Sequence, residues 1–337
     1  MRIWEELSST DSVAGVTEAA GVAAVDAREL TAHAPDRHVM LLDERRTLLA
    51  RCSCWWRRVP RVPGHRIGVI GHYAAADAGV GIALVTDACR RLRDAGCTLA
   101  IGPMDGNTWR RYRFVVDRGV EPPFLFEPHH PGDWPRHFTT AGFAELATYS
   151  SAVNDDLSGE DPTIDATAAR LASHGITIRT LDRADLDVEL HRIFMLSLSS
   201  FCRNAFFTPI DEPEFLTQYR SVLPLVRPEL VWLAERERDL VGFLFALPDV
   251  LQPRGGAADA MIVKTVAVAP EMAGVGIGGL LVSLVHREAH RLGFRRAIHA
   301  LMHENNVSSQ NISRRRARTI RRYALFGKRL APEMRLA

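Results

Sequence analysis

Residues 266–279 read Val-Ala-Val-Ala-Pro-Glu-Met-Ala-Gly-Val-Gly-Ile-Gly-Gly, and this stretch decides how the rest of the chain is interpreted. The apolar run before Pro270 is typical of a strand, and the apolar positions from Ile277 onward repeat with the period of a helix. A strand, a glycine-rich turn and a helix start form an anion site, because the first helical N–H groups have no partner within the helix. Glycines also lack the Cβ atoms that would block a phosphate. The alternative interpretation is a tight strand-to-helix turn that serves packing alone and binds no ligand.

The pentapeptide Ala-Gly-Val-Gly-Ile occurs twice, at 78–82 and at 273–277. In both halves it follows a predicted hairpin and one further strand, and it precedes a helical pattern and a short strand. Each helix is expected to stop at a glycine, Gly96 or Gly293. The expected strands are 39–43, 47–55, 66–73 and 98–101 in the first half, and 231–237, 240–247, 261–268 and 297–302 in the second. The sequence therefore predicts a duplicated α/β domain.

An acidic segment joins the two halves. Residues 154–165 contain five acids and no basic residue, which is the composition of a solvated linker. A short helix is expected at 167–173 and a strand at 176–179, with Asp182 as the N-cap of the next helix. The predicted organisation is a first domain at 1–153, a linker with a short helix at 154–175, and a second domain at 176–337.

Composition excludes several classes of protein. A chain of 337 residues suits two domains, and a net charge of +2 does not indicate nucleic-acid binding. No apolar run reaches the ~18 residues of a membrane span, and the N-terminus lacks a signal-peptide core. Five scattered cysteines favour reduced thiols, so we expect a cytoplasmic protein. Cys52-x-Cys54 has no second cysteine pair, and the sequence predicts no metal site.

Residues 266–278 resemble the fourth strand and the pyrophosphate loop of the GNAT superfamily of acyl-CoA-dependent N-acyltransferases. That loop usually reads Gln/Arg-x-x-Gly-x-Gly/Ala, and Glu271 stands here where Gln or Arg is usual. Asn306-x-x-Ser309 is similar to the motif that opens the family's next helix, and residues 320–326 resemble its closing strand. The resemblance implies an α/β (α+β) fold of two tandem GNAT-like domains. Each would be a mixed, mainly antiparallel central sheet flanked by helices.

A dinucleotide-binding Rossmann fold is the competing interpretation of the same glycines. Gly274-x-Gly276-x-x-Gly279 matches its fingerprint. However, that fold begins with the strand before the loop, whereas a hairpin comes first here. A Rossmann fold also has an acid about 20 residues after the glycines, at the end of the next strand. In this sequence the next strand ends at Glu304, which is too far along the chain.

The resemblance implies acetyl-CoA or another acyl-CoA as co-substrate. In that family the backbone of the fourth strand pairs with pantetheine, and the loop amides hold the pyrophosphate. The residues so implied are Val266, Val268, Gly274, Val275, Gly276, Ile277, Gly278, Gly279 and Asn306. The first-half turn has fewer glycines, so the first domain is expected to be degenerate.

Proton-transfer groups are sought near the end of the strand after the helix. A base must take the amine proton, and an acid serves the leaving thiolate. His303 and Glu304 are the candidates there, and His299 is expected on the same face as His303 because strand side chains alternate. The family's usual acidic Tyr falls at Ser313, so Tyr323 is the remaining candidate acid.

The leading hypothesis is an N-acyltransferase, most simply an N-acetyltransferase, acting on a small-molecule or peptide amine through its second domain. A non-catalytic acyl-CoA-binding or regulatory protein is the alternative, favoured by Ser313 and Glu271. A nucleotide- or nucleic-acid-binding α/β protein is the third hypothesis. Neither nucleic acid nor a membrane is expected as a partner, and the chain is expected to be a monomer or a homodimer.

Overall fold

A computed structural model describes residues 3–7, 17–19, 21–159, 161–251, 253–254, 257–304 and 317–330. Within this part of the chain the strands form one 14-stranded sheet and one small separate hairpin. The elements of the first half are β1 (Ile3–Leu7), β2 (Thr17–Glu18), α1 (Ala27–His33), β3 (Arg37–Leu42), β4 (Thr47–Trp55), β5 (Ile67–Ala75), α2 (Ala78–Asp94), β6 (Leu99–Gly102), β7 (Phe114–Asp117), α3 (Trp134–Thr140) and β8 (Ala144–Asn154).

The second half repeats this order after a short helix. Its elements are α4 (Ile164–Ser173), β9 (Ile176–Thr180), α5 (Leu186–Phe201), α6 (Glu212–Val222), the 3₁₀ turns η1 (Leu223–Leu225) and η2 (Pro228–Leu230), β10 (Val231–Arg236), β11 (Asp239–Pro248), β12 (Pro253–Arg254), β13 (Ala257–Ala258), β14 (Ala260–Val268), the 3₁₀ turn η3 (Pro270–Met272), α7 (Ile277–Arg291), β15 (Arg296–His303) and β16 (Arg318–Arg329).

The repeated part of the sequence prediction is confirmed. The hairpins β3–β4 and β10–β11, the strands β5 and β14, the helices α2 and α7, and the strands β6 and β15 occur in the expected order. One local prediction is wrong. Asp182 does not cap the helix, because α5 begins at Leu186 with Asp185 as its N-cap. The Asp182 carboxylate instead accepts a hydrogen bond from Ala184 N at 2.9 Å, which stabilises the preceding turn.

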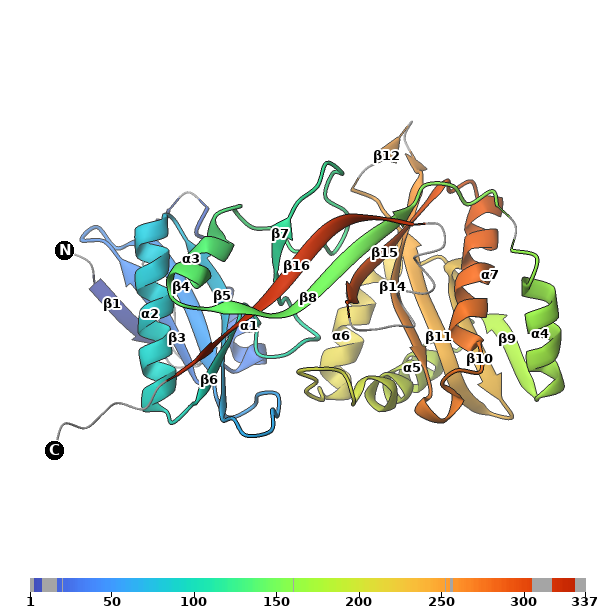
Figure 1. The fold of residues 1–337 in the computed structure, drawn as a ribbon, viewed down its shortest axis with the longest axis horizontal. Coiled ribbons are helices and arrows are strands. Elements are labelled where there is room, and N and C mark those ends of the chain that lie inside the picture. The colour runs from blue at the N-terminus through green and yellow to red at the C-terminus, as the bar shows by residue number, and fades with distance from the viewer. Residues whose placement is uncertain are drawn as a thin grey trace.

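The two halves exchange strands in the middle of the sheet. The order is β1-β3-β4-β5-β6-β16-β8-β15-β14-β11-β10-β9, so β16 lies between β6 and β8, and β8 lies beside β15. Figure 1 shows β8 and β16 running diagonally from one half to the other. Each half therefore depends on a strand from the other half. The domain boundaries at 153 and 176 stay a prediction. β16 belongs to the second half in sequence, but it completes the sheet of the first half.

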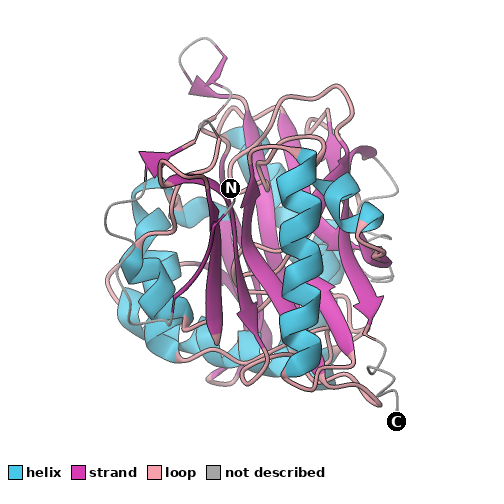
Figure 2. Cartoon of the chain, turned by 90° about the vertical axis from the view of Figure 1, so that its left-hand side faces the viewer, coloured by secondary structure: helices cyan, strands magenta, loops and turns pink. Residues whose placement is uncertain are grey.

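Helices lie on either side of the strands (Figure 2). In the second half α5 and α7 both pack on β11 and β14. β14 is the strand that leads into the glycine turn. This core is continuous and apolar, with Phe215, Phe243 and Leu281 fully buried. The first half has its own core between α2, α3 and the strands β3–β5. Among the described residues no helix combines the length and the apolar character that crossing a membrane requires.

Candidate functional site

The second half contains a splayed pair of parallel strands. β14 pairs with β15 only from Ala260↔Arg296 to Val263↔His299, although both strands continue further. The register between β11 and β14 shifts just beyond that point, at Lys264. Because Ala269 N donates to Val241 O on the β11 side, strand alternation turns the backbone of Val268 and Val266 toward β15. This edge can accept an extended ligand as an added strand.

One polar side chain already reaches that edge. Ser200, at the end of α5, donates its hydroxyl to the Val268 carbonyl at 2.9 Å. It thereby joins the helix to the strand at the point where the strands have separated. No local pattern singles out this serine, because the contact depends on how α5 crosses β14.

The glycine turn connects β14 to α7 without a side-chain cap. Gly276 is the N-cap of α7 with φ 101°, and it supplies no side-chain cap to the first-turn amides. Gly274 also has a positive φ, at 81°, which a residue with a side chain rarely adopts. A Cβ at Gly274 or Gly279 would meet no atom within 4 Å. The turn therefore presents helix N-terminal amides to open space, as an anion site requires.

The turn is packed against the strand on its inner side. A Cβ at Gly278 would lie 3.5 Å from the Val268 side chain and 3.7 Å from that of Val266. The structure thus brings together Val266, Val268, Gly274, Val275, Gly276, Ile277, Gly278 and Gly279, the implied cofactor-binding residues. Asn306, the remaining one, lies outside the described residues, as do Ser309 and Ser313.

Arg170 of α4 is a neighbour of the turn that sequence reasoning missed. Its Nη2 donates to Val275 O at 2.8 Å, and a Cβ on Gly276 would lie only 3.0 Å from the same nitrogen. An exposed guanidinium beside a phosphate-sized turn adds positive charge where an anion would bind. Glu271, the acid that departs from the family motif, is exposed in η3.

His303 is the last residue of β15, in its splayed part, and Glu304 follows it. The His303 ring packs edge-on against Tyr149 of β8, with 4.9 Å between the ring centroids. Burial, together with the nearby Arg113 guanidinium, lowers the pKa of His303 from its usual value. The imidazole is therefore neutral at pH 7 and able to accept a proton. Glu304 is engaged elsewhere, since it accepts from Thr148 Oγ1 at 2.7 Å and from Arg322 Nη1 at 3.0 Å.

Tyr323 is fully buried in β16 and belongs to a hydrogen-bonded network between the halves. Its hydroxyl donates to Glu127 Oε1 at 2.6 Å and lies 3.0 Å from Ser151 Oγ, which in turn accepts from Leu301 N. Burial and the Glu127 carboxylate raise the pKa of Tyr323 well above its usual value. The network ends on a buried ion pair between Arg321 and Glu127. The hydroxyl thus supports the irregular part of β15 at Leu301.

The expected common face of His299 and His303 is wrong, because β15 does not alternate regularly. Its register against β8 shifts between His299 and Met302, and Leu301 adopts φ 57°. The Nε2 atom of His299 lies 3.2 Å from that of His286 on α7, whereas His303 contacts β8. Burial lowers the pKa of His299 to about 4, which keeps this ring neutral within the core.

The first-half glycine turn has a different structure. α2 begins at Ala78 itself, and its N-cap Asp77 accepts from Val80 N at 2.9 Å. The carboxylate thus occupies the position that an anion would take. Gly81 is buried, and a Cβ there would lie 2.4 Å from both Tyr73 Oη and His137 Nδ1. This turn is a packed and self-capped helix start.

The loop after β6 joins the first half to the second. Asn107 caps this loop by accepting from Trp109 N at 2.9 Å. Trp109 Nε1 donates to Thr208 O at 2.8 Å, and Arg110 forms a bidentate ion pair with Glu214 of α6. The polar groups of Asn107 and Trp109 therefore hold the loop in place.

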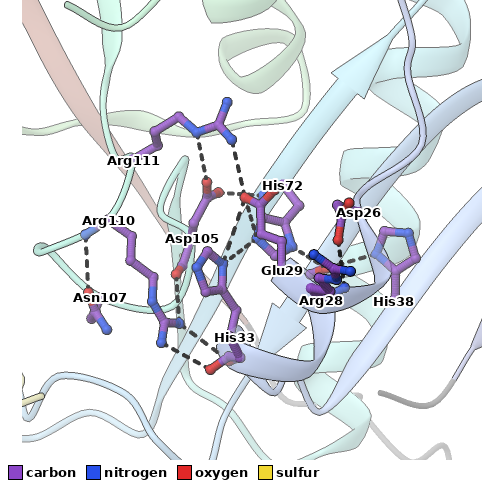
Figure 3. Close-up of polar contacts among 12 residues, drawn as sticks. Asp26, Arg28, Glu29, His33, His38, His72, Asp105, Asn107, Arg110 and Arg111 are labelled. Carbon is purple, nitrogen blue, oxygen red and sulfur yellow. Dashed lines mark hydrogen bonds and ion pairs between the residues drawn. The ribbon is translucent and has the colours of Figure 1, made fainter. Parts of the chain in front are cut away.

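A cluster of ligand-type side chains lies in the first half, where the sequence predicted no metal site. Figure 3 shows Glu29 and His33 of α1 pointing toward His72 of β5. His33 Nδ1 and His72 Nε2 are 2.8 Å apart. Sequence reasoning missed the cluster because His72 is 39 residues from His33. The spacing of four between Glu29 and His33 was the available signal, since it places both on one helix face.

Comparisons with known proteins agree with this geometry. Residues 193–315, which include β14, the glycine turn and α7, match the model of the acetyltransferase (GNAT) family. The bacterial ceramide synthase of Caulobacter vibrioides is 27% identical over 191 residues, which are 56% of this chain and 49% of the relative. The chain therefore spans about half the length of this curated relative.

Solved structures share the fold across both halves. A tandem GNAT protein from the clavulanic acid biosynthesis pathway aligns over 99% of this chain and 100% of its own, with a TM-score of 0.52 and 13% identity. A GCN5-related N-acetyltransferase from Sphaerobacter thermophilus aligns over 89% of this chain and 82% of its own, with a TM-score of 0.51 and 16% identity. Residues 193–315 thus match a GNAT acetyltransferase domain, within a molecule that shares the fold of a tandem GNAT protein.

Proposed function

We propose that the protein is an acyl-CoA-dependent N-acyltransferase whose site is in the second half. The observation that carries the proposal is the splay of β14 from β15 next to an uncapped, glycine-lined helix start. An extended pantetheine arm suits the backbone edge at Val266 and Val268. The pyrophosphate suits the amides of residues 274–279, with Arg170 beside them. The implied co-substrate is acetyl-CoA or another acyl-CoA.

The reaction proposed is direct transfer. The amine nitrogen attacks the thioester carbonyl carbon, the C–S bond breaks, and an amide forms as the CoA thiolate leaves. We assign proton removal from the amine to His303, because its lowered pKa keeps it neutral and it follows the splayed part of β15. Tyr323 is assigned a positioning role through Ser151 and Leu301. Positioning of the two reactants supplies much of the rate.

The acceptor is proposed to be a small-molecule or peptide amine. The ceramide synthase relative adds a lipid amine to this class, because a ceramide is an amide. All five cysteines are free, and four of them are buried, which suits the proposed cytoplasmic location. A monomer or a homodimer remains our expectation for the assembly.

A specific observation favours the non-catalytic alternative. Of the three proposed catalytic groups, Glu304 is held by Arg322 and Thr148, and the Tyr323 hydroxyl is buried in a network. His303 is the group to which the catalytic proposal assigns proton transfer. A protein that binds acyl-CoA without transferring the acyl group needs the splayed strands and the glycine turn. It needs no proton-transfer group.

The test separates binding from turnover. Calorimetry with CoA and with acyl-CoAs from acetyl to palmitoyl measures binding. Release of free CoA with a panel of small, peptide and long-chain amines measures transfer. We expect binding to one site and amine-dependent CoA release. Binding without release across the panel would support the non-catalytic alternative, and no binding of any acyl-CoA would overturn both functions.

A further inference from the structure

We propose that Glu29, His33 and His72 form a zinc site in the first half, separate from the glycine turn and independent of the acyltransferase proposal. Glu29 and His33 are one helical turn apart on α1, and His72 comes from β5. Two imidazoles and one carboxylate are a ligand set that zinc commonly takes. Figure 3 shows the three side chains converging on one point.

The three donor atoms are close enough to meet one ion after a small side-chain adjustment. His33 Nδ1 and His72 Nε2 are 2.8 Å apart, and Glu29 Oε1 is 4.0 Å from the first and 3.7 Å from the second. Tetrahedral zinc with bonds of about 2.1 Å keeps its donors roughly 3.4 Å apart. The two ring nitrogens must therefore exchange their mutual hydrogen bond for the ion and separate by about 0.6 Å, while Glu29 Oε1 already lies near the required spacing.

A second layer of contacts fixes the orientation of His72. Its Nδ1 lies 2.9 Å from Ser53 Oγ, which is 2.8 Å from His38 Nδ1. The backbone N–H of His72 donates to Asp105 Oδ1 at 2.5 Å, and its carbonyl accepts from Arg51. Metal-binding histidines are typically anchored through the other ring nitrogen in this way, and that anchoring directs Nε2 at the ion.

The charge around the cluster permits a divalent cation. The carboxylates of Glu29 and Asp105 face the guanidinium of Arg111, at 3.1 Å and 3.8 Å respectively. The Arg111 side chain is 78% exposed, so it can turn into solvent when an ion takes its place beside Glu29. Arg110 is held by an ion pair with Glu214 and by a hydrogen bond to the His33 carbonyl at 3.3 Å. Three protein ligands leave a fourth tetrahedral position for water.

The experiment uses the full-length protein without an affinity tag, after removal of metals with a chelator. Cys202 is replaced by Ser in every sample, because it is the exposed cysteine and cysteine thiolates bind zinc. Zn²⁺ is titrated against a chromophoric chelator, and Co²⁺ is titrated while its visible absorption is recorded. We expect one equivalent of each metal and a cobalt spectrum typical of four-coordinate nitrogen and oxygen ligation.

His33→Gln and Glu29→Gln are the test variants, since both side chains are partly exposed and replaceable. Each is expected to weaken zinc binding by roughly 100-fold or more, since a ligand matters more than an outer-shell partner. His191→Gln is the matched control, because His191 and Glu212 form an exposed pair at 2.7 Å and no third ligand-type side chain joins them among the residues that the structure describes. Parent-like zinc binding in both test variants, or no stoichiometric binding by the parent, would overturn the proposal. If one variant does not fold, the other decides.

Discussion

The two copies of Ala-Gly-Val-Gly-Ile have the same sequence and opposite roles. In the first half the helix begins at the first residue of the pentapeptide, Ala78, whereas in the second half it begins at the last, Ile277. The first copy is therefore wound into α2, and the second forms the turn that precedes α7. The residue before each copy explains the difference. Asp77 caps a helix that begins at the next residue, whereas Met272 is the last residue of a 3₁₀ turn that begins at Pro270.

This contrast teaches that a glycine motif acquires its function from its position relative to the helix start. Gly81 of the first copy is packed against Tyr73 and His137, so its missing side chain serves packing. Gly276 of the second copy has φ 101° and an uncapped helix behind it. We therefore propose that a phosphate binds the second set of amides and not the first.

The largest expected effect tests whether chemistry belongs to the second half. His303→Gln should lower kcat by roughly 100- to 10,000-fold while CoA still binds, because general-base catalysis contributes about that much. Since the pKa of His303 is lowered, kcat/KM should stay constant near pH 7 and fall on acidification below about pH 6.5, where the base becomes protonated. Steady-state rates of CoA release check both points. His65→Gln, an exposed first-half change, is the control, and equal activity in both variants would remove His303 from the mechanism.

The next effect compares the two turns directly. Gly279→Glu adds a carboxylate to the first turn of α7 in open space, and Gly79→Glu adds one to the first turn of α2. A first-turn acid does not harm a helix, so both variants should fold. Calorimetry should show CoA affinity reduced by roughly 100-fold in the former, about 2.7 kcal/mol, and unchanged in the latter. Gly279→Gln separates charge from size. Loss of binding with Gly79→Glu alone would move the cofactor site to the first half.

The sequence predicted the parts of this comparison that depend on local pattern. Alternation and turn residues located both hairpins, and helical periodicity with the stops at Gly96 and Gly293 located α2 and α7. The exchange of β8 and β16 could not be predicted, because pairing between strands more than 160 residues apart leaves no local signal. The irregularity at Leu301 also escaped prediction, since the supporting Ser151 is distant in sequence.

The candidate site divides in the same way. The residues of the glycine turn were found because they are contiguous and chemically distinctive. Ser200 and Arg170 were missed because a helix from elsewhere brings each of them to the strand or the turn. His72 was missed for the same reason, and the isolated histidine carried no partner along the chain. Sites assembled from distant elements require the fold before they can be recognised.

A smaller effect concerns the network that joins the halves. Tyr323→Phe removes the hydroxyl between Glu127 and Ser151 while Arg321 still pairs with the carboxylate. The free energy of unfolding should fall by about 1.5–3 kcal/mol, which is typical of a lost buried hydrogen bond to a charged group. Denaturant titration measures it, and kcat should change less than about threefold, well below the effect of a lost proton-transfer group. A hundredfold loss of kcat in a protein of unchanged stability would instead make Tyr323 the catalytic acid.

The smallest effect is at the first-half turn itself. Gly81→Glu is unsuitable there, because its side chain would strike Tyr73 and His137 and disturb the fold whatever the turn binds. Asp77→Ala is the appropriate change, since it removes the carboxylate that accepts from Val80 N and frees the amides of α2. The free energy of unfolding should fall by about 1 kcal/mol, the usual contribution of an N-cap. Calorimetry should still find one CoA site per chain, because Gly81 and its neighbours stay packed. A second CoA site in this variant would show that Asp77 masks a working phosphate turn, and the two halves would then differ by one capping residue rather than by the position of the helix start.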